Sequence, residues 1–77
     1  MNTEYATSDF WLACYLRAAG YRMTDTRRDG SRLQFMFENT PDLRAAVQDF
    51  FSGAALVSPQ AMASECRQMK SLIHNAP

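Results

Sequence analysis

The 77-residue sequence has little of what catalytic sites need: it contains one histidine, two cysteines and three glycines. His74, the only histidine, lies near the C-terminus, so Cys14 or Cys66 would have to reach it through the core to act as a histidine-assisted nucleophile. The glycines punctuate helix ends and a turn and form no phosphate-binding loop, and the acidic residues occur singly. We therefore expect no enzyme activity, no catalytic residue and no cofactor.

Metal-ligand spacing is also lacking. Cys66 and His74 are separated by two turns of one expected helix and lie in different directions, which is not the pattern of a zinc site. We expect no metal. Cys14 and Cys66 both lie in apolar helical segments, so we expect them to behave as small buried hydrophobic residues and not to form a disulfide.

Neither sign of charge is in excess, because eight Lys and Arg residues balance eight Asp and Glu residues. Proteins that bind nucleic acid through many phosphates usually carry a basic excess, so the neutral balance argues against a large nucleic-acid surface and leaves room only for a small patch. Apolar runs stay well short of the ~18 residues that suggest a membrane helix, and no basic segment followed by an apolar stretch opens the chain. We expect a cytoplasmic protein with no membrane partner.

What the sequence does contain is enough apolar material for a core, at 47% of the residues, with 12% aromatic. A chain of this length is expected to form one domain that buries about 60% of the surface of its unfolded state. We predict a single domain over residues 1–77, with residues 1–6 and 75–77 as loose tails.

Three helices are marked by capping signals. The first is expected from an N-cap at Thr7 or Ser8, with Asp9 in the first turn and Gly20 as the terminator. The second is expected from the Thr40-Pro41 pair to Gly53. The third is expected from Ser58-Pro59 to about His74, after a short connection whose Leu56 and Val57 plug one end of the core.

Between the first two helices, residues 21–26 and 32–38 alternate like strands and predict a hairpin. A two-residue Asp29-Gly30 turn would divide the apolar residues between both faces of the hairpin. A three-residue loop over residues 28–30, with a bulge at Gly30, gathers them on one face, and burial favours this second register. It pairs Tyr21 with Phe37, Met23 with Phe35, and Asp25 with Leu33.

The expected fold is therefore a small α+β domain of order α-β-β-α-α, in which a two-stranded antiparallel hairpin packs on three helices. A hairpin alone is marginally stable in water, so its apolar face must lie against the helices.

The first helix is apolar almost all round, and a domain this small has difficulty burying every side of it. Aromatic surface residues beside an arginine are typical interface anchors. The alternative is that the N-terminal residues and the third helix cover them. We expect a non-enzymatic domain that binds a protein or self-associates as a homodimer. Its candidate interface residues are Phe10, Trp11, Cys14 and Arg17.

The alternative function is a small nucleic-acid-binding accessory protein. Two-stranded ribbons enter the major groove in some DNA-binding proteins, and residues at i, i+3 and i+7 of a helix share one face that can meet phosphates. The candidate residues are Arg22, Arg27, Arg28 and Arg32 on the hairpin, with Arg67 and Lys70 on the third helix. Solvated surface charges explain the same residues, and we favour a protein partner over nucleic acid.

An ordered set of short motifs resembles a family of short bacterial and phage-associated proteins catalogued only as a domain of unknown function. The motifs span residues 5–74: Thr7-Ser8-Asp9, Leu12-Ala13, Leu16, Gly20-Tyr21, Phe35-x-Phe37-Glu38, Val57 and Arg67-x-x-Lys70-x-x-Ile73. Met69 departs from the pattern, where leucine is expected. The resemblance implies a self-contained cytoplasmic domain of a phage or mobile element, acting as an accessory protein, in which Arg67 and Lys70 merit testing.

Overall fold

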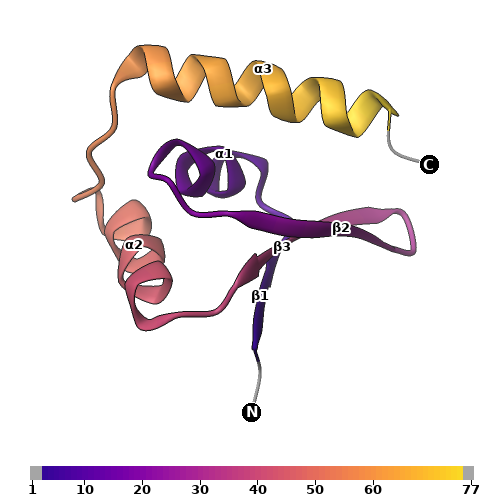
Figure 1. Cartoon of the computed structure of the whole chain (residues 1–77), viewed down its shortest axis with the longest axis horizontal. Coiled ribbons are helices and arrows are strands. Elements are labelled where there is room, and N and C mark those ends of the chain that lie inside the picture. Colours follow the sequence, from indigo (N-terminus) through magenta and orange to yellow (C-terminus); the bar gives the residue numbers. More distant parts are fainter. Residues whose placement is uncertain (1–2, 76–77) are drawn as a thin grey trace.

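The computed structural model describes residues 3–75 and shows six elements (Figure 1). In chain order these are β1 (Glu4–Thr7), α1 (Phe10–Ala18), β2 (Met23–Asp29), β3 (Arg32–Glu38), α2 (Pro41–Ser52) and α3 (Pro59–Asn75). The α+β class is confirmed, but the antiparallel sheet has three strands, in the order β1-β3-β2. The order of elements is therefore β-α-β-β-α-α, and β3 is the central strand.

Strand β1 corrects the expectation that residues 1–6 are a loose lead-in. It pairs antiparallel with β3, so that Tyr5 lies opposite Phe37 and Thr7 lies opposite Phe35. Tyr5 packs against the buried core, which ties the start of the chain to the sheet. Residues 1, 2, 76 and 77 of the expected tails lie outside the described residues, and Asn75 is the last residue of α3.

The backbone of β1 alternates between its two sides. The Asn39 amide donates to the Thr3 carbonyl at 3.0 Å, so these two residues form a hydrogen-bonded antiparallel pair. Hydrogen-bonded pairs recur at every second residue, which directs the backbone groups of Tyr5 and Thr7 toward β3. The N–H and C=O of Ala6 are therefore turned away from β3, toward the outer edge of the sheet.

The hairpin between β2 and β3 has neither register considered from the sequence. Asp29 pairs with Arg32, so the loop consists of Gly30 and Ser31 alone. Gly30 has φ 64°, as the first central position of a type II′ turn requires, and type II′ turns match the twist of the flanking strands. The predicted three-residue loop over residues 28–30, with its bulge at Gly30, is wrong. The loop has only two residues, and it ends at Ser31 because Gly30 and Ser31 close the turn.

The hairpin does contain a bulge, but the bulge lies at the end away from the turn. A register shift falls between Met23 and Asp25 of β2, which leaves Thr24 as the extra residue of a bulge. The shift lets Met23 pair with Phe37 on the helix-facing side of the sheet. The expected partners of Phe35 and Leu33 are wrong: Thr26 and Arg28 are the residues opposite them.

Local capping agrees closely with the sequence. The Thr40 hydroxyl accepts from the Leu43 amide at 3.1 Å, and Pro41 follows it at the first helical position of α2. The Ser58 hydroxyl does the same for the Ala61 amide at 3.0 Å at the start of α3. The start of α1 needs a correction, since its N-cap is Asp9, which accepts from the Leu12 amide at 3.1 Å. A side-chain acceptor here satisfies an amide that lacks a helical partner.

Helix α1 lies at the centre of the molecule. Its residues 12–16 are all buried, because β1, α2 and α3 each pack against a different side of it. Helix α3 lies above α1 and continues beside the hairpin, while α2 lies at the opposite end from the hairpin tip (Figure 1). The core cluster formed by buried residues is Leu12, Ala13, Cys14, Tyr15, Leu16, Phe35, Phe37, Leu43, Ala46 and Met69.

Helices α1 and α2 run antiparallel. The Tyr21 hydroxyl, just beyond the end of α1, donates to the Asp42 carbonyl at the start of α2 at 3.1 Å. The rings of Tyr15 and Phe50 lie 5.5 Å apart, closer to the other end of the pair. The N-terminal end of α1 therefore lies beside the C-terminal end of α2.

The alternation of β1 makes a matched pair of proline substitutions informative. Ala6→Pro should change the free energy of unfolding by less than about 1 kcal/mol, because the lost N–H is not used by β3 and proline is tolerated at such edge positions. Tyr5→Pro should cost at least about 2 kcal/mol, because it removes a ladder hydrogen bond and a packed side chain. Urea unfolding measures both, and equal losses would contradict this register.

Candidate functional site

Arg17 is engaged within the molecule. Its Nε lies 3.0 Å from Oε1 of Glu65 on α3, and its Nη2 donates to Oε1 of Gln68 at 3.2 Å. Nη1 also contacts the sulfur of Met69 at 3.3 Å. The Glu65 Oε1 atom is buried, and its contact with Arg17 is an ion pair without the alignment of a hydrogen bond. Arg17 therefore fastens α1 to α3.

Cys14 is fully enclosed beside this junction. The pKa of its thiol is raised to about 12, first by burial and then by the side-chain hydrogen bond and charge of Cys66 and by the charge of Glu65, against a lowering by Arg17. Because the thiolate is the nucleophilic form of cysteine, the raised pKa keeps Cys14 inert near neutral pH. Both cysteines are free thiols.

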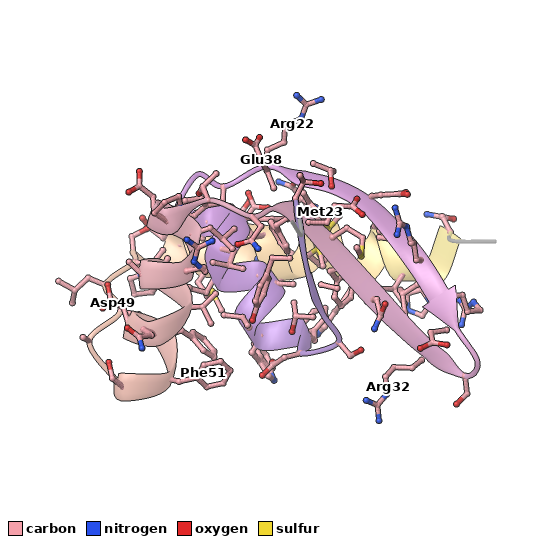
Figure 2. All side chains as sticks on the ribbon, turned by 90° about the horizontal axis from the view of Figure 1, so that it is seen from below. Arg22, Met23, Arg32, Glu38, Asp49 and Phe51 are labelled. Atoms are coloured by element: carbon pink, nitrogen blue, oxygen red, sulfur yellow. The ribbon has the colours of Figure 1, made fainter. Side chains whose placement is uncertain are left out.

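Three large apolar side chains remain in solvent, at the start of α1, near the end of α2 and in the connection to α3. Trp11 of α1 is 57% exposed, Phe51 of α2 is 65% exposed, and Leu56 in the connection to α3 is 92% exposed. We call these three residues the exposed apolar end. In Figure 2, Phe51 lies at the far end of α2 from Glu38, the last residue of β3.

The two exposed aromatic rings each contact the ring of a neighbouring, partly buried phenylalanine. The ring of Phe10 meets that of Trp11 edge-on at 5.3 Å. The ring of Phe50 meets that of Phe51 in the same way, also at 5.3 Å. Phe10 and Phe50 themselves pack against the core. The exposed rings thus rest on partly buried ones, which limits their freedom to move.

The four interface candidates predicted from the sequence have different environments. Trp11 is exposed, Phe10 is partly buried beneath it, Cys14 is inside and Arg17 is tied to α3. Phe51 and Leu56, which are also exposed, were not among these candidates. Leu56 was expected to plug the core, but Val57 is the residue of that pair that packs against it. An apolar Leu-Val pair in a connection does not show which member turns inward.

The basic residues do not form one site. Arg27 pairs with Glu4 across the outer face of the sheet at 3.1 Å and lies 3.8 Å from Asp25. Arg28 shares the helix-facing side with Leu33, its partner across the hairpin. Arg22 and Arg32 extend from the molecule in opposite directions (Figure 2). Arg67 and Lys70 are exposed on α3.

Met36 lies on the outer face of the sheet, yet it is only 5% exposed. The strand order sets it between Ala6 on β1 and Asp25 on β2. The Arg27–Glu4 ion pair joins the two outer strands over the same central strand. This face is thus closed by charged side chains and offers little apolar surface.

A groove lies between β1 and α2. One hollow of about 570 Å³ is lined by Tyr5 of β1 together with Pro41, Arg44 and Val47 of α2. A second hollow of about 560 Å³ adjoins it and is lined by α2 residues alone, among them Asp49 and Phe51, with Val47 lining both hollows. We call the joined hollows the β1–α2 groove. Burial, and secondarily the charge of Asp9, raise the pKa of the Tyr5 hydroxyl, so it stays a neutral hydrogen-bonding group.

Metal and membrane sites find no support among residues 3–75. No group of three or more His, Cys, Asp and Glu residues there could hold a metal ion. His74 is exposed at the end of α3, and Cys14 lies in the core. No helix in this part of the chain is both long and apolar enough to span a bilayer.

The described residues form a small α+β domain, and comparison with protein families shows which family it belongs to. The model of a domain of unknown function, DUF5659, matches residues 2–75, and the chain belongs to this family. No curated protein and no solved structure matches the chain. The resemblance noted in the sequence is thus confirmed as membership of a family of unknown function.

The Arg17 junction predicts a measurable coupling. Arg17→Ala should lower the free energy of unfolding by about 1–3 kcal/mol, because it leaves the buried Glu65 oxygen without its cation. In the Glu65→Ala background the same change should cost at least about 1 kcal/mol less. A double-mutant cycle by urea unfolding measures this coupling. Arg22→Ala is the matched control, expected within about 0.5 kcal/mol of the parent, and a coupling near zero would refute the junction.

The Cys14 thiol predicts a loss of stability in alkali. In the unfolded chain the thiol ionises near its ordinary pKa of 9.0, whereas in the folded chain it stays protonated to about 12. The unfolded state alone releases the proton between these values, so stability falls as pH rises from 9 toward 12. Urea unfolding at pH 7 and at pH 10.5 should show a larger loss for the parent than for Cys14→Ala. Identical losses would contradict the enclosed thiol.

Proposed function

We propose that this chain is a non-enzymatic protein-interaction domain that docks through its exposed apolar end. The observation that carries the proposal is the exposure of Trp11, Phe51 and Leu56 at 57%, 65% and 92%. Single exposed apolar residues are ordinary on protein surfaces, but large aromatic ones such as Trp11 and Phe51, on adjacent ends of two antiparallel helices, are typical of contact surfaces.

The composition of this end favours a protein partner. Tryptophan is among the residues most enriched at the energetic centres of protein interfaces, where it fills a pocket on the partner. Trp11 is the only tryptophan of the chain, and its ring is braced by Phe10. A braced ring loses less side-chain entropy on binding, which raises the affinity per contact.

The narrower expectation is that the domain is a phage or mobile-element accessory protein that binds a host protein or a second copy of itself. It stays a prediction. A protein partner is favoured over nucleic acid because the exposed apolar end carries no cation, while the basic residues proposed to contact nucleic acid are divided between the hairpin region and α3. The nucleic-acid alternative also stays a prediction, and binding to duplex DNA at low salt tests it.

A double substitution tests the proposal. Trp11→Ala with Phe51→Ala should leave the fold intact, because both side chains are largely in solvent, and should reduce partner binding at least tenfold. Affinity capture from host extract with the full chain, alongside sedimentation over a concentration series, measures partner binding and self-association. An Arg22→Ala variant, changed at an exposed residue elsewhere, should behave as the parent.

The contradicting result is equally clear. A parent that stays monomeric at every concentration and captures nothing beyond what the double variant captures would remove the basis for a docking role at this end.

A further inference from the structure

The β1–α2 groove has the form of a site for an extended chain. Strand β1 is an outer strand of the sheet, and its Ala6 turns a backbone donor and acceptor away from β3. In both views β1 lies between the hairpin and α2, so its outer edge faces that helix (Figures 1 and 2). Sheet edges of this kind bind extended peptides by adding a strand, with the side-chain pockets beside the edge selecting the sequence.

The charge of the groove indicates what such a peptide must carry. Arg44 lines it, and its Nη1 donates to Oδ1 of Asn39 at 2.9 Å, which holds the guanidinium near the end of β3. The carboxylate of Asp49 lines the second hollow, but no carboxylate among residues 3–75 forms an ion pair with Arg44 in the first. An arginine in this position suits a carboxylate, which it can bind with two parallel hydrogen bonds.

The apolar part of the groove sets the spacing. Tyr5 and Val47 line the middle, and Phe51 lines the end that leads to the exposed apolar end. Arg44 and Phe51 are two helical turns apart, about 10 Å, which an extended chain covers in about three residues. Side chains of a strand that face one way recur at every second residue. An acidic residue followed or preceded by apolar residues two and four positions away fits the groove.

We propose that the β1–α2 groove binds an extended segment of a partner protein, which adds to β1 as a fourth strand, with an acidic side chain on Arg44 and apolar side chains against Val47 and Phe51. The proposal rests on the function proposed above and names the class of partner. The hollow of about 410 Å³ beside β2 takes only Met23 from that strand and is otherwise lined by residues of the loop before it, α1 and α3, which is why the segment is assigned to β1.

Panning of a phage-displayed library of random 12-residue peptides against the full chain tests this assignment. The selected peptides should share an acidic residue with apolar residues at alternate positions. Synthetic copies should lose at least tenfold in affinity for Arg44→Glu, because the substitution replaces attraction by repulsion. They should lose a similar factor for Ala6→Pro, which removes the outward N–H. Arg67→Glu, the same charge change on exposed α3, should leave their affinity unchanged.

The other outcomes overturn the assignment. Peptides without the alternating pattern, no selected peptide at all, or affinities unaffected by both Arg44→Glu and Ala6→Pro would show that the groove does not take a strand. A dimer of the parent that Ala6→Pro abolishes would show that a second copy fills it. None of these results bears on capture of a partner through Trp11, so the proposed function is tested separately by its own experiment.

Discussion

The enclosure of α1 is the constraint on which the rest of the structure depends. Five successive residues of this nine-residue helix are buried, because the sheet, α2 and α3 pack around it. A domain this small has a high ratio of surface to volume. Its central helix is buried only because the other elements pack around it. The Arg17–Glu65 contact and the Cys14 side chain both lie in the interface between α1 and α3.

Enclosure of the middle of α1 leaves its first turn at the margin. Trp11 precedes the buried run by one residue, and the antiparallel α2 brings Phe51 to the same end. No further element of residues 3–75 covers this end, since the chain passes from α2 to α3 through a connection whose Leu56 is itself in solvent. The exposed apolar end is therefore a consequence of how the core is built. The β1–α2 groove leads from this end to the edge of the sheet, so the two proposed contact regions adjoin at Phe51.

Much of the fold was predictable because its signals are local. The Thr40-Pro41 and Ser58-Pro59 caps begin their helices as expected, and the alternation of Phe35 and Phe37 identified the buried face of β3. Strand β1 was missed because four residues form too short a pattern, and its pairing partner lies some thirty residues away. The hairpin register failed because Asp29-Gly30 and Gly30-Ser31 both satisfy turn preferences, and the bulge at Thr24 has no sequence signal. The exposure of Trp11 was predictable because a small domain cannot bury every side of the apolar first helix. The exposure of Phe51 and Leu56 depends on how α2 and α3 pack around α1, which the sequence does not show.

Helix α1 is enclosed while Trp11, its only tryptophan, stays largely in water. The fluorescence of Trp11 in the free protein measures the exposure of this side chain directly. The account predicts an emission close to that of indole in water and efficient quenching by acrylamide, with both signals nearly unchanged on unfolding in urea. A blue-shifted emission that resists quenching until the chain unfolds would show that Trp11 is covered, and would contradict the exposed apolar end.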